Sequence, residues 1–138
     1  LTNIENLNAR DLTLDDLDGT RPEILVSDLS FISLKLALPK ALELAADGAY
    51  GLFLIKPQFE VGREKLGAGG VVRDPALRRS AVLDVAEYAY DVGLGTMGIA
   101  ASPLPGPAGN VEYFLWLRRG APAIDEAALD TAIAMGPA

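Results

Sequence analysis

The sequence predicts an α/β domain with a mostly parallel sheet, because apolar strand-like runs alternate with helical patterns along its 138 residues. Strands are expected at residues 23–27, 50–55, 96–101 and 111–117. The last two are joined by residues 102–109, which hold three prolines and show no helical period. Because a parallel pair needs a longer crossover, we expect this final pair to be antiparallel. Trp116, in the last apolar run, is expected in the core.

Three helices are expected in the same pattern. The first, at residues 33–46, is rich in Leu and Ala, and its Pro39 predicts a kink or two shorter helices. The second follows the N-cap candidate Asp74 and ends at Gly93. Its predicted buried stripe consists of Leu77, Ala81, Val85, Tyr88 and Val92. The third covers residues 125–135.

The composition bounds the chemistry. Half of the residues are hydrophobic and 22% are charged, as in one ordinary globular domain. Cysteine and histidine are both absent from the sequence, which excludes Cys/His metal sites, Ser-His-Asp triads, thiol nucleophiles and disulfides. Acid–base chemistry must therefore come from Asp, Glu, Lys or Tyr. The apolar runs are too short to span a bilayer and nothing reads as a signal peptide, so we expect a cytoplasmic protein without membrane or metal partners.

The net charge of −7 disfavours a general nucleic-acid binder, but the basic residues are concentrated. Residues 56–79 contain six of the twelve Lys and Arg residues against three acids. This segment is either a solvated surface or a local patch that steers a phosphate-bearing substrate. Within it, residues 57–73 carry four glycines without a clear period, which predicts a long loop, and a mobile lid fits better than a phosphate-binding P-loop.

Polar residues at the strand ends are the candidates for a site, since open α/β sheets bind ligands there. Asp28 follows the first strand and Lys56 the second. Each also has a structural interpretation, Asp28 as a helix cap and Lys56 as a solvated lysine. Glu112 enters an otherwise apolar strand, where a carboxylate needs a partner, and Lys56 is a candidate. If the three form a catalytic set, the Lys56 amine should lie within roughly 3–5 Å of a carboxylate of Asp28 or Glu112.

Longer motifs point to a family. They lie at residues 27–34 (SDLSFISL), 55–63 (IKPQFEVGR), 69–75 (GGVVRDP) and 102–112, with Asn8-Ala9-Arg10 near the start. Together they resemble the haemolysin A (TlyA) branch of the FtsJ-type methyltransferases, from residue 4 to about residue 118. The resemblance implies a Rossmann-like, S-adenosylmethionine-dependent fold with the strand order 3-2-1-4-5-7-6. It also implies methylation of a ribose 2′-hydroxyl in ribosomal RNA, with that RNA or a ribosomal subunit as partner.

The resemblance also implies roles for single residues. The family's catalytic set is Lys-Asp-Lys-Glu, whose last three members match Asp28, Lys56 and Glu112. Asn8 and Asp28 match cofactor-binding positions. The expected RNA contacts are Gln58, Arg63, Lys65 and Arg73.

The chain begins with Leu1, and the resemblance places the first catalytic lysine, the N-terminal strands and the cofactor loop upstream of it. We therefore expect residues 1–120 to be the C-terminal portion of a methyltransferase domain and residues 121–138 to be its helical extension. The strand at 24–28 would then be an exposed edge that invites self-association.

Asp28, Lys56 and Glu112 suit such a reaction. A lysine can take the ribose proton only as a neutral amine, and burial or a nearby cation would favour the neutral form. Two alternatives stay open. One is a non-catalytic RNA- or protein-interaction module that retains the fold. The other is a membrane-active haemolysin, which the lack of a strongly basic amphipathic segment makes weaker.

Overall fold

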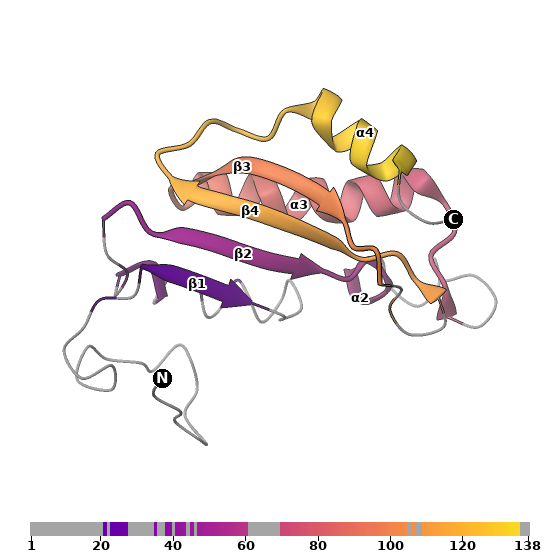
Figure 1. Ribbon diagram of the computed structural model, residues 1–138, viewed down its shortest axis with the longest axis horizontal. Coiled ribbons are helices and arrows are strands. Elements are labelled where there is room, and N and C mark those ends of the chain that lie inside the picture. Colours follow the sequence, from indigo (N-terminus) through magenta and orange to yellow (C-terminus); the bar gives the residue numbers. More distant parts are fainter. Residues whose placement is uncertain are drawn as a thin grey trace, which may run out of the picture.

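Four strands form one mixed sheet in the computed structural model, which describes residues 21, 23–27, 35, 38–39, 41–43, 45, 47–60, 70–104, 106 and 109–135. The strands are β1 (Ile24–Ser27), β2 (Tyr50–Ile55), β3 (Leu94–Ala101) and β4 (Tyr113–Arg119). Their order across the sheet is β1-β2-β4-β3 (Figure 1). β1 and β2 are parallel, whereas β4 is antiparallel to both of its neighbours. Three strands thus share one direction and the last is reversed, as predicted, and the order reproduces the 4-5-7-6 part of the implied arrangement.

The sheet is accompanied by α2 (Pro57–Glu60), α3 (Pro75–Asp91) and α4 (Glu126–Met135), and the described residues 35, 38–39 and 41–43 of the predicted 33–46 helix are also helical. The predicted start of α3 is confirmed, since the Asp74 carboxylate accepts a hydrogen bond from the Ala76 N–H at 2.9 Å. The prediction missed α2, which begins at a proline, a residue suited to the first helical position. The rest of the predicted lid, residues 61–69, lies outside the described residues. None of the described helices is long and apolar enough to cross a bilayer.

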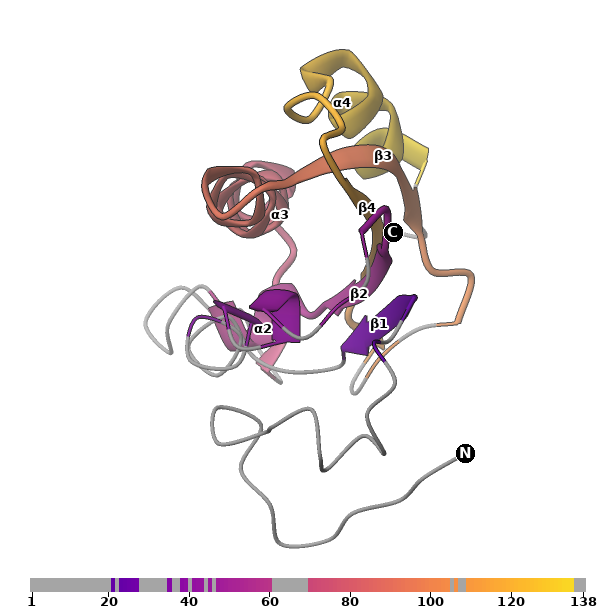
Figure 2. The ribbon, with the colours of Figure 1, turned by 90° about the vertical axis from the view of Figure 1, so that its left-hand side faces the viewer.

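The core lies between α3 and one face of the sheet. α2 and α3 are on the same side of the sheet (Figure 2). The buried side chains of α3 are Arg78, Ala81, Val82, Val85, Ala86 and Ala89. Of the predicted stripe, Ala81 and Val85 are buried, and the half-buried Tyr88 and Val92 pack against the core, whereas Leu77 is only half-buried. The small alanine side chains let α3 lie close to β4, whose Leu115 and Leu117 are fully buried. This close packing leaves no room for larger residues on that side of the helix.

The opposite face of the sheet carries apolar side chains that remain exposed. Val26, Leu52 and Trp116 occupy paired positions on β1, β2 and β4, and paired positions share a face. Their exposed fractions are 75%, 39% and 45%. No described helix covers this face over β1 and β2 (Figure 2). The prediction that Trp116 belongs to the core was wrong, because an apolar strand looks the same in sequence whether one or both faces are covered.

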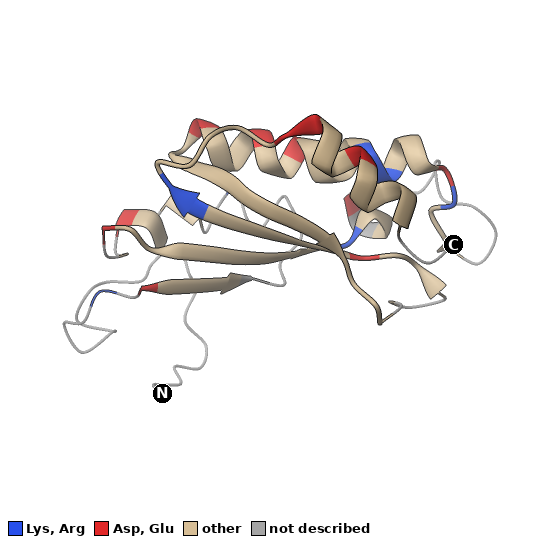
Figure 3. Cartoon of the chain, turned by 45° about the horizontal axis from the view of Figure 1, so that its top comes forward, with Lys and Arg blue, Asp and Glu red and all other residues tan. Residues whose placement is uncertain are grey.

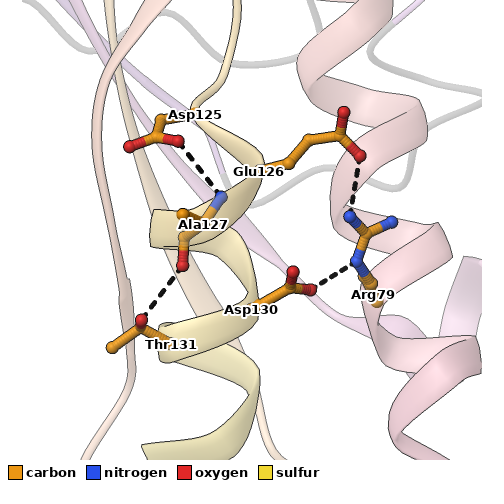
Figure 4. A network of polar contacts seen from close by, with 6 residues as sticks. All are labelled: Arg79, Asp125, Glu126, Ala127, Asp130 and Thr131. Atoms are coloured by element: carbon orange, nitrogen blue, oxygen red, sulfur yellow. Dashed lines mark hydrogen bonds and ion pairs between the residues drawn. The ribbon is translucent and has the colours of Figure 1, made fainter.

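α4 is attached to α3 by both apolar and charged contacts. Leu129, Ala132 and Ile133 are buried against the rest of the fold. On the exposed side, the Arg79 guanidinium of α3 pairs with Glu126 at 2.8 Å and Asp130 at 2.6 Å (Figure 4). The hydrogen bonds that Arg79 donates, first to Glu126 and then to Asp130, raise the pKa of Arg79. Exposed pairs contribute little to stability, so the buried side chains hold α4 in place.

Candidate active site

The carboxyl edge of the sheet brings two of the candidate residues together. Ile55, the last residue of β2, pairs with Tyr113, the first residue of β4. Lys56 and Glu112 therefore flank the same pair at the same edge. β1 runs parallel beside β2, so its end approaches this edge too, as predicted. Lys56 is half-buried and Glu112 is buried.

Four of the predicted site residues lie outside the described residues. These are Asn8, Asp28, Arg63 and Lys65. The placement of the Lys56 amine against the carboxylates of Asp28 and Glu112 thus stays a prediction. Arg73 is exposed at the start of α3, where a ligand could reach it, and its contact with RNA also stays a prediction.

The Glu112 carboxylate is held by a side chain from α2. Glu112 is only 7% exposed, and its Oε2 accepts a hydrogen bond of 2.9 Å from Nε2 of Gln58, which is 8% exposed. A buried carboxylate needs such a donor. The sequence did not predict this contact, because it depends on α2 and joins residues 54 positions apart. Direct contact between Gln58 and RNA remains a prediction.

Asn110 ties the segment before α3 to the loop that carries Glu112. Its Oδ1 accepts a hydrogen bond from the Val72 N–H at 2.9 Å, and its Nδ2 donates to the Gly70 carbonyl at 3.1 Å. The Asn110 carbonyl in turn accepts from the Gly106 N–H at 2.8 Å. Asn110 is thus a buried link between the end of the glycine-rich segment and the candidate site. The sequence did not predict this role, because Asn110 appeared there only as part of the motif at residues 102–112.

A buried Arg and Tyr lie behind this edge. Arg78 of α3 donates from Nη2 to the Arg73 carbonyl at 3.2 Å. Burial raises the pKa of Tyr113, and the nearby Arg78 opposes that rise. Tyr113 is consequently protonated at neutral pH and is a poor candidate for the base. Its hydroxyl and Gln58 Oε1 are buried without a hydrogen-bond partner in the described part of the chain.

Charged residues are distributed unevenly over the described part of the chain. Acidic residues lie along α3 and α4, whereas the strands are almost free of acids (Figure 3). Basic residues lie at both edges of the sheet: Lys56 and the exposed Arg73 are near the carboxyl edge, whereas Arg118 and Arg119 end β4 at the opposite edge. The helical side is therefore the least favourable one for a polyanion.

A sheet of this order, with ionisable residues at the carboxyl ends of its strands, defines a Rossmann-like α/β domain, and open sheets of this kind bind ligands at that edge. A family profile described as FtsJ-like methyltransferase matches residues 1–119. The chain belongs to this family.

Individual relatives agree with the family assignment. The chain is 53% identical over 115 residues to the 16S/23S rRNA (cytidine-2′-O)-methyltransferase TlyA of Mycobacterium tuberculosis, covering 83% of this chain and 42% of the relative. It is 33% identical over 113 residues to Hemolysin A of Brachyspira hyodysenteriae, covering 82% of this chain and 47% of the relative. A solved structure described as a hemolysin from Lactococcus lactis matches with 35% identity and a TM-score of 0.82, over 95% of this chain and 64% of that one. The chain thus spans less than half the length of the curated relatives it matches.

Proposed function

We propose that this chain forms the C-terminal portion of a methyltransferase domain that methylates a ribose 2′-hydroxyl of ribosomal RNA as part of a longer protein. The observation that carries the proposal is the position of Lys56 and the buried Glu112, which lie next to the same strand pair at the carboxyl edge of the sheet. The chain that brings them there is a member of this family. The activity stated in the name of the Mycobacterium tuberculosis relative supports the substrate class.

In this proposal Lys56 is the general base. As a neutral amine it would take the proton that the ribose hydroxyl must lose to become the nucleophile. Glu112 and Asp28 orient the amine, and Asn8 and Asp28 contribute to the cofactor site. Arg63, Lys65 and Arg73, with Gln58 at the edge, contact the RNA.

The described edge fits the methyl donor that the family implies. When bound, S-adenosylmethionine supplies an activated methyl group on a sulfonium cation. The buried Glu112 carboxylate and the unpartnered carbonyl oxygen of Gln58 lie close together and make this edge favourable for a cation. This chain's task is then to position the ribose and accept its proton.

The proposal extends to the organisation and setting of the protein. Residues 1–120 belong to the methyltransferase domain and residues 121–138 are its helical extension, which packs on the same core through Leu129 and Ile133. The partner is ribosomal RNA or a ribosomal subunit, which places the protein in the cytoplasm.

A chimeric protein tests the function. In this chimera the matched stretch of the chain replaces its counterpart in the Mycobacterium tuberculosis relative. We expect transfer of labelled methyl from S-adenosylmethionine to ribosomal RNA, with the product mapped as a 2′-O-methylated ribose by its resistance to alkaline cleavage. A chimera that unfolds cooperatively but transfers no methyl, beside an active intact relative, would contradict enzymatic function and favour an interaction module.

The proposal includes self-association of the isolated chain through β1. This strand is outermost among the strands that the structure describes, and its Ile24 and Val26 are exposed. We expect Val26→Lys to shift the chain from concentration-dependent oligomers to a monomer in sedimentation velocity, because a charge on an edge strand opposes pairing. Met135→Lys is the matched control, since Met135 is equally exposed but lies in α4. A monomeric wild-type chain at all concentrations would contradict the prediction.

A further inference from the structure

We propose that Gly106 and Gln58 are positioning residues that together give the Glu112 carboxylate a single location at the carboxyl edge. Gly106 provides the space for the carboxylate, and Gln58 provides the hydrogen bond that holds it there. The catalytic relevance of this arrangement rests on the function proposed above, but the arrangement itself does not.

Gly106 lies directly against the side chain of Glu112. A Cβ placed on Gly106 would be 2.2 Å from Glu112 Oε2, 2.6 Å from Cδ and 3.0 Å from Cγ. These three Glu112 atoms are the nearest atoms that such a Cβ would meet. Every other residue type carries a Cβ, so only glycine leaves the carboxylate where it is.

The requirement for glycine at this position is one of space and not of backbone conformation. Among the described residues, the glycines with left-handed φ are Gly48, Gly70, Gly93, Gly109 and Gly120, and Gly106 is not one of them. Alanine can therefore adopt the backbone of residue 106 without strain. Its methyl group would push away the far end of a flexible side chain, so the carboxylate should move while the fold remains.

Gln58 holds the carboxylate through its side-chain amide. Its Nε2 donates to the same Oε2 atom that Gly106 accommodates. Gln58 is itself buried on α2, which packs against α3, so the donor has little freedom. Displacement of Oε2 by a Gly106 side chain should therefore break the hydrogen bond to Gln58.

The side-chain amide of Gln58 offers a direct test in the 138-residue chain, because Gln58 is its only glutamine. In ¹H–¹⁵N spectra we expect Gly106→Ala to shift the Gln58 NH₂ signals towards their positions in Glu112→Ala and to speed their exchange with water. Gly98→Ala is the matched control, since a Cβ there would make only an ordinary 3.6 Å contact with Trp116. Gln58 signals that stay in place in Gly106→Ala would overturn the proposal.

Methyl transfer by the chimera tests whether the position of the Glu112 carboxylate affects the rate of the reaction. We expect Gly106→Ala to lower kcat about 10- to 100-fold with an unchanged KM for RNA, because misplacement of an orienting group by about 1 Å can cost that much. Gly98→Ala should retain full kcat. Loss of activity in Glu112→Ala but not in Gly106→Ala would overturn the positioning proposal alone, whereas full activity in Glu112→Ala would overturn the proposed role of Glu112.

Discussion

Replacing Lys56 with alanine is expected to abolish methyl transfer by the chimera, with a loss of about 10²- to 10⁴-fold or more in kcat. Lys56 directly follows β2, at the edge where Glu112 directly precedes β4. The ribose hydroxyl is a weak acid and attacks only when a base takes its proton. Single-turnover transfer of labelled methyl to ribosomal RNA measures the effect on chemistry, separately from product release.

Arginine at position 56 separates a base from a mere positive charge. Lys56→Arg keeps the charge, but a guanidinium does not lose its proton in a protein, so we expect it to be as inactive as Lys56→Ala. Lys35→Ala is the control for removing a lysine, since Lys35 is exposed and its backbone carbonyl, which alanine retains, accepts the hydrogen bond from Tyr88. Substantial activity in Lys56→Arg would show that residue 56 supplies charge and not proton transfer.

Asn110→Ala is expected to lower the free energy of unfolding by about 1–3 kcal/mol, the usual cost of leaving a buried polar group unpaired. The substitution removes the acceptor for the Val72 N–H and the donor to the Gly70 carbonyl. Urea unfolding followed by fluorescence of Trp116, the only tryptophan, measures the change.

Arg79→Ala provides the contrast for Asn110. It breaks two ion pairs, to Glu126 and Asp130, but both acids are exposed. We expect the midpoint of unfolding to remain nearly unchanged, since solvent screens such pairs. A larger loss from Arg79→Ala than from Asn110→Ala would contradict the view that the buried link matters more than the surface network.

The topology of the sheet followed from the sequence because it depends on local signals. The apolar runs at 24–27 and 50–55 carry the strands, and the proline-rich connection before Glu112 cannot hold a crossover helix, which makes β4 antiparallel. Once those directions are known, Lys56 and Glu112 must meet at one edge. The common edge is therefore predictable although the two residues are far apart in the chain.

The finer contacts of the site could not be predicted in the same way. The four-residue helix α2 is too short to show a period, so the inward direction of Gln58 has no signature. The links from Gln58 to Glu112 and from Asn110 to Val72 join residues 54 and 38 positions apart, and their partners are set by packing alone. The burial of Arg78 likewise follows from the rotation of α3 on the sheet, which the alanine-rich sequence leaves open.

The place of β4 in the sheet has a consequence for synthesis on the ribosome. β4 is the last strand to emerge, yet it lies between β2 and β3, which have no direct pairing with each other. Until about residue 119 has left the exit tunnel, the edges of β2 and β3 that pair with β4 remain unpaired. Nascent chains with unpaired strand edges are prone to associate with other chains. The same delay keeps Glu112 away from Lys56 until β4 has been synthesised, so a chain that stops before β4 does not bring these two residues to one edge.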